Sequence, residues 1–298
     1  MDTVRLDPID NVVTATRALE VGHDVAGTYT RALIPSGHKI ATQDIPRGEP
    51  IRKYAQIIGY AEADISAGDH VHTHNVEFRN TDADYEFSTD LRPVTPVPQA
   101  MRDTFMGYRR ENGQVGTRNY IAIVTSVNCS ATAARMIANH FTPDVLAAYP
   151  NVDGVVALTY RANCSMRVGG PTYRVLQRTL AGMARHPNVG AALFMGLGCE
   201  TNQACQIVET YRLARDGTVP LRCLSIQELG GIQPAVRAGI ETIEEMLPIA
   251  DAVQRTPHPL SELVLALQCG GSDGWSGVTA NPLLGLVADE IVNQGGTA

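Results

Sequence analysis

The chain has 298 residues, and its 24 Lys and Arg stand against 31 Asp and Glu, a formal net charge of −7. This acidic balance argues against a nucleic-acid partner, which requires a basic surface. No apolar run reaches the roughly 18–20 residues of a membrane span, and the first residues lack the pattern of a signal peptide. We therefore expect a cytoplasmic protein of about two domains, with neither nucleic acid nor membrane as partner.

The first 79 residues contain a fourfold internal repeat. Each copy reads apolar-x-x-Gly-x-x-apolar, and the copies lie at residues 19–25, 34–40, 45–51 and 65–71. Glycine permits the positive φ of a tight turn, and the flanking aliphatic residues begin and end short strands. The pattern predicts a small all-β domain over residues 1–79. Residues 80–103 are polar and rich in proline, which is typical of an extended linker.

From residue 104 onward, apolar runs alternate with helical patterns. Residues 104–110 and 116–120 predict a hairpin. The aliphatic runs lie at 121–127, 155–160, 191–195, 221–226 and 263–267, and the helical patterns that follow them lie at 130–140, 171–185, 200–215, 232–246 and 282–293. This alternation predicts an α/β domain over residues 104–298 with a mostly parallel sheet. Because residues 295–298 look like the start of another strand, we expect this domain to be incomplete.

Four of the six cysteines follow the carboxyl end of a predicted strand. They are Cys129, Cys164, Cys199 and Cys269. Ligands bind at this edge of open α/β sheets, and helix N-termini there favour the thiolate. Thiolates select zinc, iron or an iron–sulfur cluster, so a shared metal site is one hypothesis and inert thiols are the alternative. Without an export signal a disulfide framework is not expected, and Cys205 and Cys223 are assigned to packing.

Two further motifs suggest ligand binding. Alternate residues of a strand share a face, so residues 69–75 (DHVHTHN) would place His70, His72 and His74 on one side. Imidazoles in such an array can hold a divalent ion; a solvated edge strand is the alternative. The loop at 268–277 (QCGGSDGWSG) leaves backbone N–H groups for a carboxylate or phosphate, unless it is a plain loop.

The sequence resembles the altronate/galactarate dehydratase family of sugar-acid hydro-lyases over nearly its whole length. The first domain carries IPSGHKIA at 34–41, RKYAQIIG at 52–59 and GDHVHTHN at 68–75. The second carries FMGYRRENG at 105–113, VGTRNY at 115–120, SVNCS at 126–130, GLGCE at 196–200 and QCGGSDG at 268–274. The resemblance implies an SAF-type β-clip module followed by a dehydratase domain that continues beyond residue 298.

The resemblance also implies an activity and a cofactor. The reaction would remove water from an aldonate or aldarate to give a 2-keto-3-deoxy acid, with a divalent metal that we expect to be Fe2+, ahead of Mn2+, Zn2+ or an iron–sulfur cluster. A metal and N–H donors would stabilise the charge that forms when a proton leaves the carbon next to the carboxylate.

Site roles follow from these motifs. We predict His72 and His74 as metal ligands, with Cys129, Cys164, Cys199 and Cys269 on the same ion or on a separate cluster. Lys39 and His72 are the candidate catalytic residues, although an exposed lysine is the alternative for Lys39. Arg118, Asn128, Gly270, Gly271 and Ser272 are the candidate substrate-binding residues.

The chain departs from the family pattern at two places, which puts the substrate in doubt. Tyr160 stands where the family has His, and Asn163-Cys164-Ser165 stands where it has Gly-Cys-Gly. Two other functions stay open: a sulfo-lyase that expels sulfite from a sulfonated hydroxy acid, and a non-catalytic subunit with structural zinc. Homo-oligomerisation also stays open.

Overall fold

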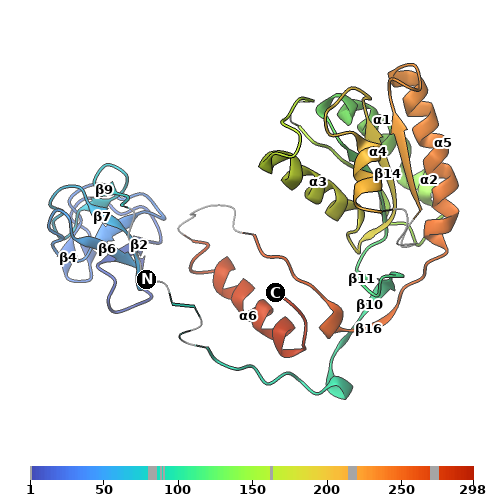
Figure 1. The fold of residues 1–298 in the computed structure, drawn as a ribbon. Helices are drawn as coiled ribbons and strands as arrows, with labels where there is room; N and C mark the ends of the chain where they lie inside the picture. The colour runs from blue at the N-terminus through green and yellow to red at the C-terminus, as the bar shows by residue number, and fades with distance from the viewer. Residues whose placement is uncertain are drawn as a thin grey trace. The chain divides into compact units, whose positions relative to one another are not determined.

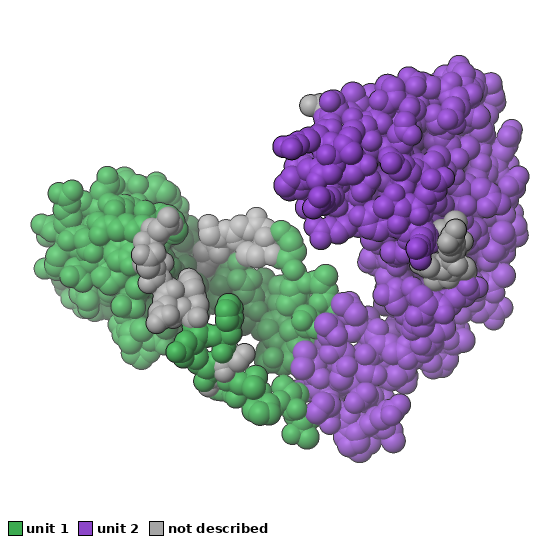
Figure 2. Space-filling view, viewed as in Figure 1, with its two compact units in different colours: residues 1–95, 265–290, 298 green, residues 96–264, 291–297 purple. Residues whose placement is uncertain are grey.

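The computed structural model describes residues 2–79, 86–87, 89, 91–161, 164–213, 220–268 and 275–298. Contacts within the chain group it into two compact units (Figure 2). Unit 1 comprises Met1–Thr95, Leu265–Glu290 and Ala298, and unit 2 comprises Pro96–Val264 and Ile291–Thr297. None of the described helices is long and apolar enough to cross a bilayer.

Residues 2–79 form only short strands, as the repeat predicts (Figure 1). One antiparallel sheet has the order β1 (Thr3–Val4), β2 (Val12–Ala15), β5 (Lys39–Ala41) and β8 (His70–Val71). A second has the order β6 (Pro50–Lys53), β7 (Gln56–Ala61) and β9 (Val76–Glu77), and β3 (Asp24–Val25) pairs with β4 (Thr28–Tyr29). The expected all-β domain is confirmed.

The four repeats form turns of the same kind. Each central glycine has a φ between 81° and 88°, and the apolar residues that flank the four turns are all at most 2% exposed. The turns also pair with each other, because Leu19 bridges to Ile34 and Ile45 bridges to Ile65. Gly68 shows why glycine is needed, since a Cβ there would lie 1.9 Å from the carbonyl oxygen of Tyr29.

Unit 2 contains a parallel sheet between two layers of helices (Figure 1). Its order is β13 (Gly154–Leu158), β12 (Tyr120–Thr125), β14 (Val189–Gly196) and β15 (Leu221–Ser225). Alternate residues of β12 and β14 face opposite layers. Ile121 and Leu193 pack with α1 (Ala131–His140) and α5 (Ile232–Asp251), and Ala122 and Phe194 pack with α3 (Pro171–Ala184) and α4 (Ala204–Thr210). The predicted α/β fold is confirmed.

Smaller elements complete the fold. The expected hairpin forms from β10 (Thr104–Arg109) and β11 (Val115–Gly116), and an unpredicted strand, β16 (Thr256–Pro259), pairs antiparallel with β10. The helical pieces are η1 (Gln99–Met101), η2 (Asn128–Ser130), α2 (Pro143–Leu146), η3 (Leu260–Glu262) and α6 (Ala280–Asn293).

Two expected elements differ from the structure. The helix expected over 200–215 is shorter, because α4 begins only at Ala204 and ends at Thr210. The run at 263–267 is not a fifth strand of the parallel sheet, because its only described β contact is an isolated parallel bridge from Val264 to Thr297. An aliphatic run needs neighbouring strands to become part of a sheet, and sequence periodicity does not supply them.

Candidate functional site

Four histidines gather on one side of the N-terminal β domain. His38 lies in the second repeat turn, just before β5; His70 lies on β8; His72 and His74 follow β8. The pairing of β5 with β8, which aligns Ile40 with His70, brings the two segments together. The Nδ1 atom of His38 is 2.9 Å from the Nε2 atom of His70.

The rings of these histidines are in mutual contact. Centroid distances are 4.8 Å from His38 to His72, 5.0 Å from His38 to His70, 5.3 Å from His70 to His74 and 5.5 Å from His70 to His72. His70, His72 and His74 are held together by a turn, and not by the expected alternation of side chains along a strand. Asn75 closes this turn, since its N–H donates to the His72 carbonyl and its side-chain amide donates to the His70 carbonyl.

His38 is the member of this histidine cluster that sequence reasoning missed. The available signal was its position directly after the glycine of a repeat turn. His70 lies two residues after the glycine of another repeat turn, and the pairing of β5 with β8 brings the two segments into contact.

Burial and positive neighbours lower the pKa of two histidines of this cluster, His70 and His72. Burial, and after it the nearby His38, His74, His72 and Lys39, together lower the pKa of His70 from 6.5 to about 4. The pKa of His72 is lowered for similar reasons, with burial first. Lys39 is half-buried, and burial together with the charge of Lys53 lowers the pKa of its amine. The lowered pKa values of His70 and His72 favour neutral imidazoles there, beside a Lys39 amine that loses its proton more readily than an exposed lysine.

The donor atoms of the histidine cluster are of a type that suits a divalent metal ion. Neutral imidazoles suit Fe2+, Zn2+ or Mn2+ as ligands, so the donor type at His72 and His74 fits a divalent ion. Among the described residues, however, no three His, Cys, Asp or Glu side chains are arranged around a common point. The rings of His38 and His72 are stacked, with an interplanar angle of 14°.

The described end of the glycine-rich loop lies in the same unit as the histidine cluster. A Cβ built on Gly37 would be 3.5 Å from the indole nitrogen of Trp275, and one built on Gly277 would be 2.4 Å from the ring of Tyr54. Within unit 1, the residues that follow the loop thus pack beside the turn that carries His38. The predicted Cys269, Gly270, Gly271 and Ser272 lie outside the described residues.

Three predicted thiols lie at the carboxyl edge of the parallel sheet. Cys129 follows β12 within η2, Cys164 follows β13 and Cys199 follows β14, and all three are free and exposed. The backbone joins two of these loops, since the N–H of Thr201 donates to the Cys164 carbonyl at 2.9 Å. The structure thus places these cysteines at one edge, while no metal-holding group of three forms there among the described side chains.

The two predicted substrate-binding residues of unit 2 lie at opposite edges of the sheet. Asn128 lies in η2, at the carboxyl end of β12 beside Cys129. Arg118 precedes β12, and its Nε atom lies 3.9 Å from a carboxylate oxygen of Asp153. The structure therefore groups Asn128 with the thiols and separates Arg118 from them.

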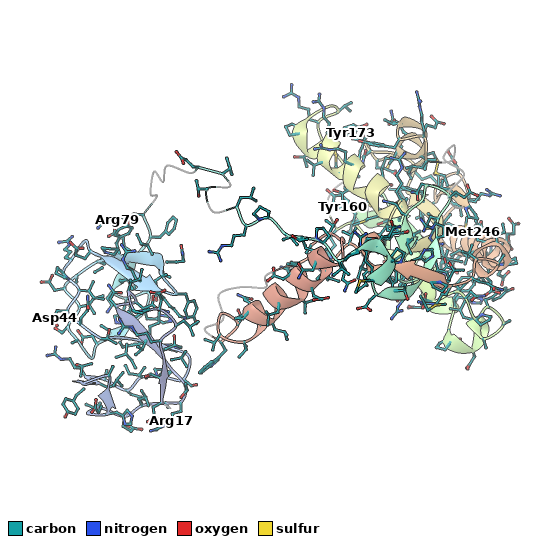
Figure 3. All side chains as sticks on the ribbon, turned by 90° about the horizontal axis from the view of Figure 1, so that it is seen from below. Arg17, Asp44, Arg79, Tyr160, Tyr173 and Met246 are labelled. Atoms are coloured by element: carbon teal, nitrogen blue, oxygen red, sulfur yellow. A yellow bond between two sulfur atoms is a disulfide. The ribbon has the colours of Figure 1, made fainter. Side chains whose placement is uncertain are left out.

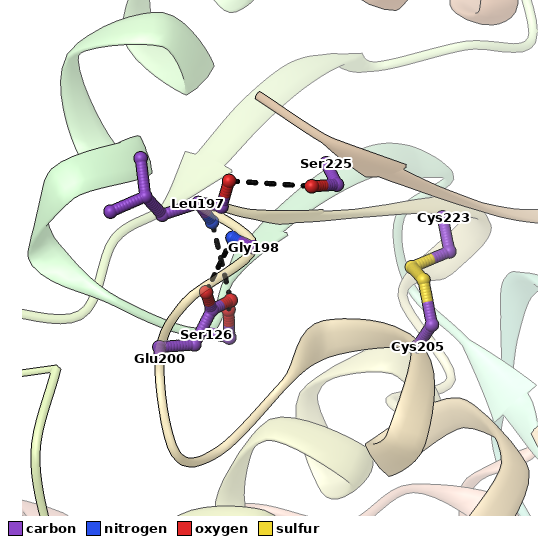
Figure 4. Close-up of a disulfide and its surroundings, with 7 residues drawn as sticks. All are labelled: Ser126, Leu197, Gly198, Glu200, Cys205, Cys223 and Ser225. Atoms are coloured by element: carbon purple, nitrogen blue, oxygen red, sulfur yellow. Dashed lines mark hydrogen bonds between the residues drawn. A yellow bond between two sulfur atoms is a disulfide. The ribbon is translucent and has the colours of Figure 1, made fainter. Parts of the chain in front are cut away.

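Glu200 and Asn202 are buried polar residues at the carboxyl edge that sequence reasoning did not single out. Glu200 accepts hydrogen bonds from the hydroxyl of Ser126 at 2.7 Å and from the backbone N–H groups of Leu197 and Gly198 (Figure 4). This carboxylate ties the end of β14 to the end of β12. Asn202 is 1% exposed, and neither its Nδ2 nor its Oδ1 atom has a hydrogen-bond partner among the described residues.

The assignment of Cys205 and Cys223 to packing is wrong, because the two form a disulfide (Figure 4). Cys205 lies in the first turn of α4 and Cys223 lies on β15, with their Cα atoms 5.7 Å apart. Contacts between α4 and β15 bring the two together. The spacing along the chain gives no sign of this contact, since only the packing of the helix over the strand creates it.

Comparison with known proteins identifies the class. The family model for the altronate/galactarate dehydratase SAF domain matches residues 1–79, that for the D-galactarate dehydratase/altronate hydrolase second domain matches 107–251, and that for the D-galactarate/altronate dehydratase C-terminal region matches 260–298. The chain belongs to the altronate/galactarate dehydratase family.

Individual relatives agree with this assignment. Altronate dehydratase of Escherichia coli is 38% identical over 302 residues, which cover 100% of this chain and 59% of the relative. Galactarate dehydratase (L-threo-forming) of E. coli is 35% identical over 89% of this chain and 51% of its own length. The (2R)-sulfolactate sulfo-lyase subunit beta of Chromohalobacter salexigens is 31% identical over 65% of this chain and 45% of its own. The chain thus spans about 59% of the length of the E. coli altronate dehydratase.

Proposed function

We propose that this chain takes part in the dehydration of a sugar acid, altronate-like or galactarate-like, to a 2-keto-3-deoxy acid. The observation that carries the proposal is the cluster of His38, His70, His72 and His74 beside Lys39, in a chain whose relatives include altronate and galactarate dehydratases. Imidazole nitrogens that can hold a metal ion and an amine with a lowered pKa are groups that can promote the elimination of water.

The chemistry assigned to these residues begins with proton removal. The neutral amine of Lys39 accepts the proton from the carbon next to the carboxylate, and the electron pair left behind forms a carbon–carbon double bond as the hydroxyl group on the β-carbon leaves. That hydroxyl departs as water with a proton from a general acid. The resulting enol then takes up a proton at the β-carbon and releases its hydroxyl proton, which gives the 2-keto-3-deoxy acid. Burial of Lys39 supports its role as the base, because it lowers the pKa of the amine.

We further propose that His72 and His74 hold a divalent ion, Fe2+ in preference to Mn2+ or Zn2+. Such an ion, when bound, supplies Lewis-acid stabilisation of the charge that develops on the substrate carboxylate. We also propose that the protein works in the cytoplasm and that its partner is the small-molecule acid itself. The Cys205–Cys223 disulfide counts against a cytoplasmic location, because most cytoplasmic proteins lack persistent disulfides.

A sulfo-lyase activity is the second candidate. It is favoured by the similarity to the sulfolactate sulfo-lyase subunit beta and by the two departures from the family pattern at Tyr160 and residues 163–165. The same proton removal would then expel sulfite in place of water.

One assay separates these functions. Anaerobically purified protein, reconstituted with Fe2+, is incubated in parallel with altronate, galactarate and sulfolactate, and keto acid and sulfite are measured. Keto acid without sulfite from a sugar acid supports the dehydratase, and sulfite from sulfolactate supports the lyase. The control variant His23→Gln should leave turnover unchanged, while His72→Gln should abolish it. Tightly held zinc without turnover of any substrate would contradict both enzyme functions.

A further inference from the structure

The Cys205–Cys223 disulfide joins a helix to the last strand of the parallel sheet. Cys223 lies on β15, which pairs with β14 and with no other described strand. Cys205 lies on α4, a helix of seven residues that packs on β14 and β15. This helix shares a layer with α3, which carries Tyr173, whereas Met246 on α5 lies in the opposite layer (Figure 3). The bond thus ties a short helix to an edge strand.

A reductant can reach this bond from solvent. Cys205 is exposed, and Cys223 is only half-buried at the margin of the core. Thiol–disulfide exchange requires that an attacking thiolate reach one of the two sulfurs. Structural disulfides resist the glutathione pool, whereas exposed ones are typically labile or regulatory. The exposure of Cys205 therefore places the bond among those that thiols can open in the folded protein.

The bond fastens the end of the loop over residues 197–203, which connects β14 to α4. Glu200 holds the start of this loop, because it accepts hydrogen bonds from the N–H groups of Leu197 and Gly198. The end of the loop has no side-chain cap, since the amide of Gln203 bonds the Gly198 carbonyl in place of an N–H of α4. A helix as short as α4 is not stable by itself in water. The disulfide is therefore a main restraint on the end of the loop.

A buried amide within the loop opposes the closed arrangement. Asn202 is 1% exposed, and neither polar atom of its side chain has a partner in the described part of the chain. An unpaired buried polar group carries a desolvation penalty, which water relieves once the group is exposed. Ile207 is fully buried in the core beneath α4 and keeps the helix itself in place. The disulfide thus favours a closed loop, and hydration of Asn202 favours an open one.

We propose that Cys205 and Cys223 form a reversible redox switch, which closes the loop over residues 197–203 when oxidised and releases it when reduced. In the oxidising direction, one cysteine thiolate attacks glutathione disulfide and displaces one glutathione. The second cysteine thiolate then attacks the mixed disulfide and displaces the other glutathione. The two cysteines lose two electrons, glutathione disulfide gains them, and the two thiol protons pass to the departing glutathione thiolates.

The switch reconciles the disulfide with the proposed cytoplasmic location. A reducing glutathione pool holds such a pair as two thiols until the level of oxidant rises. Release of the loop loosens the contact of Glu200 with Ser126, which ties the end of β14 to the end of β12. The oxidation state of the pair thereby reaches the carboxyl edge of the sheet. The switch depends neither on that location nor on the proposed dehydration.

Equilibration with glutathione tests the reversibility of the bond. The native chain is incubated in buffers with stepped ratios of glutathione to glutathione disulfide, then alkylated and digested for peptide mass spectrometry. We expect Cys205 and Cys223 to become thiols together in millimolar glutathione without denaturant, and to pair again in glutathione disulfide. A bond that persists in glutathione and opens only in denaturant would identify a structural disulfide and overturn the switch.

Hydrogen exchange tests the response of the loop. Reduction should speed exchange of the Leu197 and Gly198 amides by about tenfold or more, because local opening governs their protection. The amides of β12, an interior strand of the sheet, should exchange at the same rate in both states. Unchanged exchange at Leu197 and Gly198, or faster exchange throughout the sheet, would overturn the link between the bond and the loop.

Two double variants separate this pair from the other thiols. C205S/C223S cannot form the bond, so its loop should exchange at the rate of the reduced parent in both buffers. C129S/C164S removes two exposed thiols at the same edge of the sheet and should keep the full response. Loss of the response in C129S/C164S, or its survival in C205S/C223S, would assign the redox sensitivity to other cysteines and overturn the proposal. The glutathione titration needs neither variant, so it decides the matter even where a variant fails to fold.

Discussion

The N-terminal β domain and the parallel-sheet region of unit 2 both bring together residues that carry chemistry, but they do so differently. In the β domain, His38 and His70 lie one and two residues after the glycines of two repeat turns, and pairing of β5 with β8 makes them neighbours. In unit 2, Cys129, Cys164 and Cys199 share an edge only because three separate strands run parallel. Local repetition thus gives direct ring contacts, whereas topology gives a common edge without a metal-holding group among the described residues.

The strongest test of the repeated turn is Gly68→Ala. A Cβ at Gly68 would lie 1.9 Å from the Tyr29 carbonyl oxygen, in a residue with a φ of 87°. We expect a loss of about 3 kcal/mol or more in the free energy of unfolding, from clash and strain together. Denaturant unfolding followed by circular dichroism measures it.

Gly22→Ala is the matched control for this substitution. Gly22 has a similar φ of 82°, but nothing lies within 4 Å of an added Cβ. Only the conformational cost should remain, about 1 kcal/mol. Equal losses in the two variants would show that close packing between the turns does not stabilise the domain.

The disulfide should stabilise unit 2 alone. Cys205 and Cys223 are 18 residues apart in sequence, and closure of a loop of that size is worth about 3 kcal/mol. Cys205→Ser with Cys223→Ser should lower the unfolding free energy of unit 2 by about that amount and leave the β domain unchanged. If non-reducing peptide mass spectrometry finds both thiols free and the double variant is as stable as the parent, the pairing is refuted.

Glu200 should be the next most important stabilising residue of the carboxyl edge. Glu200→Ala leaves the Ser126 hydroxyl and the N–H groups of Leu197 and Gly198 without their acceptor, which we expect to cost about 2–3 kcal/mol. Glu209→Ala, at an exposed position on α4, is the control and should cost less than about 0.5 kcal/mol. Thermal unfolding of both variants provides the comparison, and equal losses would mean that Glu200 does not fasten this edge.

Acid should destabilise the β domain of the metal-free protein. We expect this loss of stability to be the smallest of the effects predicted here. The pKa of His70 is lowered from 6.5 to about 4 in the folded state, so between these pH values the unfolded chain binds more protons than the folded one. Stability is therefore retained above pH 6.5 and is lost as pH falls toward 4. Urea midpoints of the chelator-treated protein between pH 7 and 4 would show this loss, and His70→Gln should reduce it. A midpoint that rises with acid would contradict the assignment.

The sequence correctly predicted the features that recur at regular spacing. The four turn glycines and their buried aliphatic flanks follow from the repeat, and four of the five predicted parallel strands follow from apolar runs. It missed contacts that only packing creates, such as the Cys205–Cys223 disulfide and the Glu200–Ser126 hydrogen bond. The run at 263–267 had the right composition for a strand, yet its described partner is only Thr297.

At the candidate functional site, too, the sequence predicted some residues, and only the structure revealed others. The DHVHTHN motif identified three histidines, but His38, 32 residues away from His70 in sequence, became visible only through strand pairing. Arg118 was chosen by residue type, and the structure places it at the opposite edge of the sheet from Asn128. Residue type therefore indicates the kind of chemistry, while the edge or face on which it lies depends on topology.

The central proposal is that His72 and His74 of the β domain hold a divalent metal ion, and the alternative is that the thiols of unit 2 hold it. Anaerobic Fe2+ loading followed by elemental analysis tests it directly, in H72Q/H74Q and in the triple variant C129S/C164S/C199S. The account predicts that the histidine variant loses bound iron and that the cysteine variant keeps it. Iron retained by H72Q/H74Q and lost from C129S/C164S/C199S would contradict the account.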